Sequence, residues 1–302
     1  MVAIEIGEGR KVALPQLFSR ISLRQGVGGV PPTALVLAGI VSVQLGAALA
    51  TRLFAATGPA GAVSLRLFFA GAVLLVFWRS ALRIPRRAVP VVLAYGAVLA
   101  VMNVAFYEAI DRIPLGMAVT IEFLGPLAVA LAGSRRWIDP AWAVLAGGGV
   151  LLLTQTDGDV AWTGVVLALV AAALWASYIL LSAKLGETTS GGGGLALAMA
   201  FGGLLMAPVG IISAGTALLQ PSVLAAGFGV ALLSSVLPYS VELEALRRIP
   251  PRVFGVLMSL EPAVGALAGL AVLSQAMNLP QWAGIACVVA ASIGATRTSR
   301  AR

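Results

Sequence analysis

Ten apolar stretches follow one another along this chain, separated by short segments that hold most of its charged residues. A helix needs about 20 apolar residues to cross a bilayer, and most of these stretches approach that length. We expect spanning helices at 33–54, 62–78, 89–110, 115–133, 141–154, 162–185, 194–213, 223–246, 253–273 and 281–296. The chain is 60% apolar and 11% charged, whereas a soluble domain is about 45–50% apolar and about 25% charged. The predicted fold class is therefore an all-α polytopic membrane protein without a large soluble domain.

The basic residues predict the orientation of these helices, because loops that stay in the cytoplasm collect Lys and Arg. With the N-terminus inside, every Lys and Arg except Arg52, Arg66 and Arg112 falls in a cytoplasmic segment. Asp157 and Asp159 then fall in an outer loop without positive charge. We expect both termini in the cytoplasm, with 1–30 and 297–302 as polar tails. Within the first tail, disorder is favoured over a weak amphipathic helix at 14–23.

The rare residue types argue against several classes of chemistry. The chain has no histidine and one cysteine, so metal sites, haem and Ser-His-Asp catalysis are disfavoured, and we expect no cofactor. Cys287 lies in an apolar run and is interpreted as buried filler. The formal charge of +8 is explained by cytoplasmic loops, so no nucleic-acid partner is expected. The glycines at 191–194 lack the ending of a phosphate-binding loop.

An internal duplication appears when the chain is compared with itself at a shift of 136 residues. Between 108 and 133, eleven of twenty-six positions are identical to those at 244–269, including the Arg-Ile-Pro turn and the prolines Pro126 and Pro262. After a four-residue insertion, Pro140 and Trp142 match Pro280 and Trp282. Such self-similarity predicts a repeated structural unit. We place the repeats at 31–155 and 156–296.

Each repeat holds five predicted helices, and an odd number means that the second repeat enters the membrane from the opposite side. The charges agree, because the inner copy of the Arg-Ile-Pro turn has Arg247 and Arg252 where the outer copy has Asp111 and Gly116. Inverted repeats are an architecture of secondary transporters that work by alternating access around a midplane site. The duplication is also compatible with an enzyme or a scaffold, because a fold does not fix a function.

Charged residues inside spans are costly and are therefore functional candidates. Glu261 and Glu122 lie well inside their predicted helices, near Pro262 and Pro126, which free a backbone carbonyl and mark hinge candidates. Either glutamate is a candidate for an ammonium group or a coupling proton. Each glutamate alternatively makes a structural contact, such as an ion pair between Glu122 and Arg66. Arg66 either binds a substrate carboxylate or extends to the membrane surface.

Other polar residues in spans supply weaker candidates. The spacing of Glu108 and Arg112, repeated in Glu244 and Arg248, favours ion pairs at helix ends. Uncharged groups that either contact a substrate or join helices are Gln44, Asn103, Trp175, Tyr178, Ser235 and Tyr239. Asn103 and Tyr239 are equivalent under the repeat shift, so we expect both to face the central axis.

Several motifs carry a family resemblance. The stretches IEFLGPLAVAL (121–131), LPYSVE (237–242) and FGVLMSLEPA (254–263), with SLRL at 64–67, closely resemble the inner-membrane threonine/homoserine exporters. These are EamA-type members of the drug/metabolite transporter superfamily. The resemblance runs from about residue 31 to 296 and implies ten helices with cytoplasmic termini in the inner membrane. It also implies efflux of small neutral amino acids driven by an ion gradient or by the substrate's own gradient, and it assigns no ligand residues.

The sequence therefore predicts an exporter that binds a zwitterionic amino acid between its repeats. Glu261 or Glu122 takes the ammonium group or a proton, and Arg66 takes the carboxylate. Its partners are a small-molecule substrate and the lipid bilayer, and the chain acts as a monomer or a homodimer. The alternative is export of another metabolite or a drug, followed by a non-transporting membrane protein. An intramembrane enzyme is disfavoured, because no nucleophile and base converge in the sequence.

Overall fold

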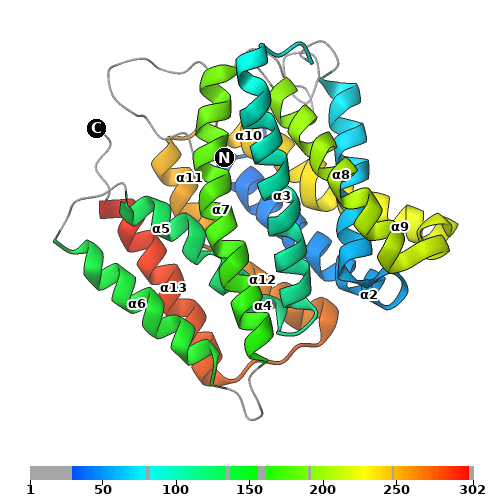
Figure 1. Ribbon diagram of the computed structural model, residues 1–302. Coiled ribbons are helices and arrows are strands. Elements are labelled where there is room, and N and C mark those ends of the chain that lie inside the picture. Colours follow the sequence, from blue (N-terminus) through cyan, green and yellow to red (C-terminus); the bar gives the residue numbers. More distant parts are fainter. Residues whose placement is uncertain are drawn as a thin grey trace.

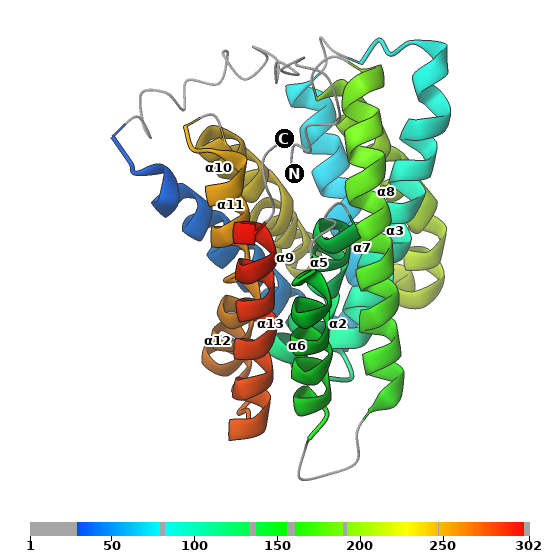
Figure 2. The ribbon, with the colours of Figure 1, turned by 90° about the vertical axis from the view of Figure 1, so that its left-hand side faces the viewer.

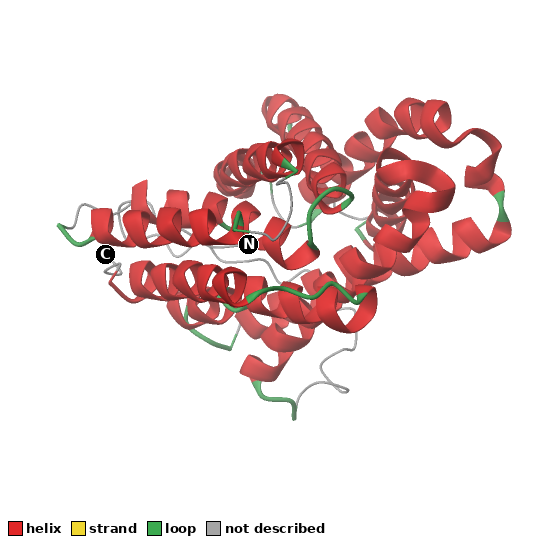
Figure 3. Cartoon of the chain, turned by 90° about the horizontal axis from the view of Figure 1, so that it is seen from below, coloured by secondary structure: helices red, strands yellow, loops and turns green. Residues whose placement is uncertain are grey.

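The protein is a bundle of helices in the computed structural model, which describes residues 29–78, 82–132, 137–155, 161–189, 192–246 and 248–298. Every regular element in these ranges is helical (Figure 3). In chain order they are α2 (Pro32–Phe77), the 3-10 helix η3 (Arg86–Ala88), α3 (Val89–Ile110), α4 (Leu115–Glu122), α5 (Leu124–Ala132), α6 (Asp139–Leu153), α7 (Trp162–Thr188), α8 (Gly193–Ala214), the 3-10 helix η4 (Gly215–Leu219), α9 (Pro221–Ala231), the π-helix η5 (Leu232–Val236), α10 (Leu237–Leu246), α11 (Pro251–Met258), α12 (Glu261–Leu273) and α13 (Leu279–Thr298). The expectation of an all-α protein is confirmed for these ranges.

The helices have the length and apolar composition of membrane spans. Eight continuous helical segments in the described ranges meet that standard, and α6 is a shorter apolar helix. The first segment, α2, has 46 residues, which as a straight helix would extend about 69 Å, more than twice the bilayer core. The protein is therefore a multi-span membrane protein.

Helix α2 is bent at Gly58, which has φ 65° and ψ 169°. A positive φ is readily adopted by glycine, and Pro59 has no N–H to continue the helical hydrogen bonds. The bend separates a first arm before Gly58 from a second arm after it. The two arms, blue and cyan in Figure 2, leave the bend in different directions. They correspond to the first two apolar stretches of the sequence.

Two further helices are interrupted at equivalent places. Helix α4 ends at Glu122 and α5 begins after Phe123, while α11 ends at Met258 and α12 begins after Ser259 and Leu260. A shift of 136 residues places Phe123 on Ser259 and makes the bounds of α4 and α11 coincide. In both repeats the interruption precedes a proline by a few residues. The sequence marked the prolines but did not predict that the helices would be divided.

Close backbone approaches pack the helices in pairs. Helix α6 lies along α13, and the second arm of α2 lies along α8 (Figures 1 and 2). A Cβ atom placed on Gly71 would lie 2.9 Å from the Ala200 Cα atom, so only glycine permits this crossing. Helix α4 packs closely on α12, whereas their repeat equivalents α11 and α5 do not pack closely on each other. Helices α3 and α7 also pack together, the first arm lies against η5 and α10, and the second arm lies against α9.

Three further sequence predictions concern helix-end ion pairs, the single cysteine and the polar segments between and beyond the helices. The ion pairs Glu108–Arg112 (2.6 Å) and Glu244–Arg248 are confirmed. Cys287 in α13 is half-buried, so the prediction of a buried residue is met only in part. The tail 1–28, the Asp157 and Asp159 loop and residues 299–302 lie outside the described residues.

Candidate functional site

Two glutamates lie buried beside the helix interruptions. Glu122 is the last residue of α4 and is 9% exposed, and Glu261 is the first residue of α12 and is 7% exposed. Their carboxyl groups are close enough to interact electrostatically. The structure thus brings together the two acidic residues that the sequence identified in separate repeats.

Gln44 joins this region from the first arm of α2. Its Nε2 donates a hydrogen bond to Glu261 Oε1 at 3.2 Å, and Gln44 is 2% exposed. Gly265 lies one turn beyond Glu261, and a Cβ atom there would lie 3.2 Å from Gln44 Oε1. The glycine therefore makes room for the amide. This contact connects the first repeat with the second.

Arg66, in the second arm of α2, is directed into the bundle. Its guanidinium donates to the Tyr107 hydroxyl at 3.3 Å and to the Ser234 carbonyl at 3.3 Å, and Cζ lies 5.6 Å from the centre of the Tyr107 ring. Among the described residues it forms no ion pair, and its buried Nε has no hydrogen-bond partner. Glu122 is within electrostatic range of it. The alternatives of a surface-directed Arg66 and of a direct Arg66–Glu122 ion pair do not describe this structure.

The carbonyl that accepts from Arg66 is made available by a proline. In a regular helix the N–H of residue 238 would bond to the Ser234 carbonyl, but Pro238 has no N–H. The helix widens to a π-helix over Leu232–Val236, a local form that is frequent at functional sites. Ser42 Oγ donates to the Leu233 carbonyl at 2.7 Å. The π-helix therefore contacts both arms of α2, and Ser235 is buried within it.

Aromatic residues from three helices lie near these polar groups. Tyr95 of α3 and Tyr178 of α7 have ring centres 4.8 Å apart, and Tyr178 and Tyr239 of α10 are near enough to interact through their hydroxyl groups. Trp175 of α7 packs edge-on against Phe123, with ring centres 5.8 Å apart. The structure therefore places Trp175 at the Phe123 interruption and brings Tyr178 close to Tyr239.

Asn103 is placed differently. It is buried in α3, and its amide donates to the Leu99 carbonyl of its own helix at 2.8 Å. Its donor is thus used within α3. The expectation that it faces the central axis together with Tyr239 stays a prediction.

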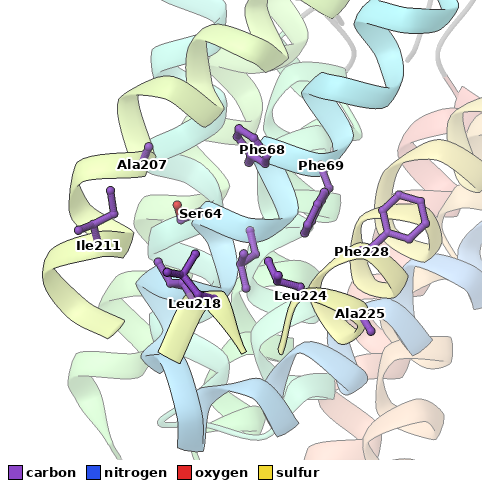
Figure 4. Close-up of a pocket in the computed structure, with 11 residues that line it drawn as sticks. Ser64, Phe68, Phe69, Ala207, Ile211, Leu218, Leu224, Ala225 and Phe228 are labelled. Carbon is purple, nitrogen blue, oxygen red and sulfur yellow. The ribbon is translucent and has the colours of Figure 1, made fainter. Parts of the chain in front are cut away.

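An apolar groove lies apart from all of these candidates. It has a volume of about 580 Å³ and runs between the second arm of α2, α8, η4 and α9. Figure 4 shows Ser64, Phe68, Phe69 and Phe228 along it. The lining is almost entirely apolar, as expected for a surface that faces lipid tails. In the described ranges, no group of three or more metal-ligating side chains is found.

This chain is similar to known proteins in sequence and in fold. The EamA-like transporter family matches residues 162–297. The threonine/homoserine exporters RhtA of Escherichia coli (strain K12) and Salmonella typhimurium (strain LT2) are each 42% identical over 275 residues, covering 89% of this chain and 92% of the relative. The chain belongs to the RhtA family of EamA-like transporters. Its RhtA relatives are named as exporters, not as enzymes. A protein of known crystal structure shares the fold, with a TM-score of 0.61 at 20% identity over 88% of this chain and 96% of that one.

In this RhtA-family chain, some residues of the site were not identified from the sequence. Tyr107 and the Ser234 carbonyl hold Arg66, and Gly46 is close to the Ser234 side chain. Pro238 is the one sequence signal for them, because a proline inside a span leaves a specific carbonyl without its donor. Tyr107 has no such signal, since its role depends on how α3 packs.

Proposed function

We propose that this protein exports threonine, homoserine or closely similar neutral amino acids across the inner membrane. It works as a secondary transporter with ten spans in two inverted five-helix repeats and cytoplasmic termini. The supporting observations are the 42% identity to exporters named for these two amino acids and the charge pattern of the interior. The single chain contains both repeats, so a monomer suffices for transport.

The observation that carries the proposal is a half-buried arginine beside a buried glutamate. Arg66 has a buried Nε without a partner among the described residues, and Glu122 is within electrostatic range. A zwitterionic amino acid carries a carboxylate and an ammonium group one carbon atom apart. The guanidinium of Arg66 suits the carboxylate because its N–H groups match the two oxygens in a plane. Glu122 then faces the ammonium group.

The inverted-repeat arrangement is supported by the packing partners. The second apolar stretch packs on the seventh, the fourth on the ninth and the fifth on the tenth, so equivalent helices of the two repeats meet each other. A two-fold axis in the membrane plane gives this pattern. The Phe123 and Ser259 interruptions, with Pro126 and Pro262 after them, are the hinges of this proposal.

Sequence differences between the repeats favour two alternating contacts. In this structure Val119 of α4 contacts Gly265 of α12, where a Cβ atom on Gly265 would lie 3.2 Å from Val119 Cβ. The repeat equivalents of these two residues are Gly255 of α11 and Val129 of α5. Each crossing therefore has one valine and one glycine, with their places exchanged. We propose that the α5–α11 contact forms when the α4–α12 contact opens.

The proposal is tested by counterflow. Purified protein is reconstituted in liposomes loaded with unlabelled threonine, and uptake of labelled threonine is followed with homoserine, valine and a cationic drug as competitors. Saturable uptake that homoserine reduces is the expected result. Uptake that only the drug reduces, or no uptake by protein that elutes as a single species in detergent, would overturn the assignment of the substrate.

A further inference from the structure

The contact between Gln44 and Glu261 has unused atoms on both sides. Gln44 Nε2 donates to Glu261 Oε1 at 3.2 Å, and both residues are buried. The remaining oxygens of the same two groups, Gln44 Oε1 and Glu261 Oε2, are buried and lack hydrogen-bond partners in the described part of the chain. Two buried acceptors without donors are costly, and such groups require an explanation.

One proton removes both deficits. A carboxylic acid and a primary amide pair through two hydrogen bonds: the amide N–H donates to one carboxyl oxygen, and the acid O–H donates to the amide oxygen. The first of these bonds is present between Gln44 and Glu261. A proton on Glu261 Oε2 supplies the second, and it also removes a negative charge from a buried site.

The described residues around Glu261 supply no alternative partner for its charge. Two acidic groups, Glu122 of α4 and Glu242 of α10, interact electrostatically with Glu261. Their negative charges oppose a negative charge on Glu261. Arg66 acts on Glu122, and the described charged residue of α13, Arg297, is in its last turn. Glu261 stands at the N-terminus of α12, whose backbone N–H groups favour an anion. Its Oε2 nevertheless makes no hydrogen bond to them within the described residues.

We propose that Gln44 and Glu261 form a proton-binding site that joins α2 to α12, with the proton on Glu261 Oε2 donated to Gln44 Oε1. Binding converts the carboxylate and one proton into a neutral acid, and release reverses this. Release leaves a negative carboxylate oxygen beside the amide oxygen and removes one of the two hydrogen bonds that Gln44 and Glu261 make with each other. The site rests on the proposed transport function and supplies its coupling ion. Glu122 is thereby left to contact the substrate.

An infrared measurement tests the proton directly and does not depend on transport. A protonated carboxyl group has a carbonyl band separate from the amide and carboxylate bands. Wild-type protein at neutral pH is expected to show this band and Glu261→Gln to lack it, while Glu108→Gln, outside the site, retains it. An unchanged band in Glu261→Gln, or its absence from the wild type, would overturn the proposal.

Transport variants test the coupling. In Glu261→Gln the two amides still pair but bind no proton, so accumulation of threonine driven by a pH gradient is expected to fall by at least about tenfold relative to the wild type. The exchanged variant, Gln44→Glu with Glu261→Gln, restores one acid and one amide and is expected to regain the response to the gradient. An undiminished gradient response in Glu261→Gln contradicts the site. Should the wild type fail to exchange threonine, the substrate proposal fails while the infrared result still decides the proton site.

Discussion

Arg66 shows how a charged residue is held inside an apolar bundle. Its guanidinium is satisfied by a phenol and by a backbone carbonyl, and Pro238 is what leaves that carbonyl open. Neither partner carries a full negative charge, so the cation keeps most of its attraction for an anion. A substrate carboxylate is therefore a stronger partner than any the described residues supply.

Replacing Arg66 by lysine tests this role. Lysine keeps the positive charge but cannot form two parallel hydrogen bonds to a carboxylate. Loss of one charge-assisted hydrogen bond costs about 1.5–3 kcal/mol, so the KM for threonine should rise roughly tenfold or more. Initial rates of counterflow against threonine concentration measure it. Arg112→Lys, at an exposed helix end, is the matched control, and an equal KM in both variants would contradict the role.

At this scale the sequence identified the polar residues of the proposed site but did not predict their contacts. Gln44, Arg66, Glu122 and Glu261 stand out because polar groups in spans are costly. The Gln44–Glu261 bond joins residues 217 positions apart, and no local pattern encodes the register between two such helices. Asn103 also stands out as a polar residue in a span, but its amide donates to a backbone carbonyl of its own helix.

The divided helices are the feature of the fold that most concerns mechanism. Each interruption places a buried carboxyl group next to a backbone that is not continuously hydrogen-bonded. The ten apolar stretches located these elements well, although their ends differ by a few residues. The bend at Gly58 falls between the first two predicted stretches, but the two interruptions were not predicted, because hydropathy measures length and composition and is insensitive to local backbone geometry.

Packing of α4 on α12 depends on Gly116. A Cβ atom there would lie 2.5 Å from the Ala266 Cα atom, so Gly116→Ala forces the helices apart. Overpacking of this kind costs about 1–3 kcal/mol, and we expect a lower melting temperature in detergent and slower counterflow. Gly147→Ala in α6 is the control, because a Cβ atom at Gly147 meets no atom within 4 Å. Equal melting temperatures for the two variants would show that this crossing tolerates separation.

For the whole molecule, the exchanged valine and glycine positions predict two mutually exclusive cross-links. In a Cys287→Ser background, cysteines at Val119 and Gly265 are expected to form a disulfide readily, because their Cβ atoms are within bonding reach. Cysteines at Val129 and Gly255 should cross-link only in the opposite state, and each disulfide should stop transport reversibly. Both pairs are followed by gel mobility with and without reductant. Full transport with the Val119–Gly265 disulfide intact would contradict alternating access through these helices.

The most direct test of the account is equilibrium binding of labelled threonine to the purified protein. We predict saturable binding that homoserine displaces and that Arg66→Gln and Glu122→Gln each weaken by at least about tenfold. Arg112→Gln and Glu108→Gln, which remove the same groups from a helix-end ion pair, should bind as the wild type does. Undiminished binding in both Arg66→Gln and Glu122→Gln would contradict a substrate site between the two repeats.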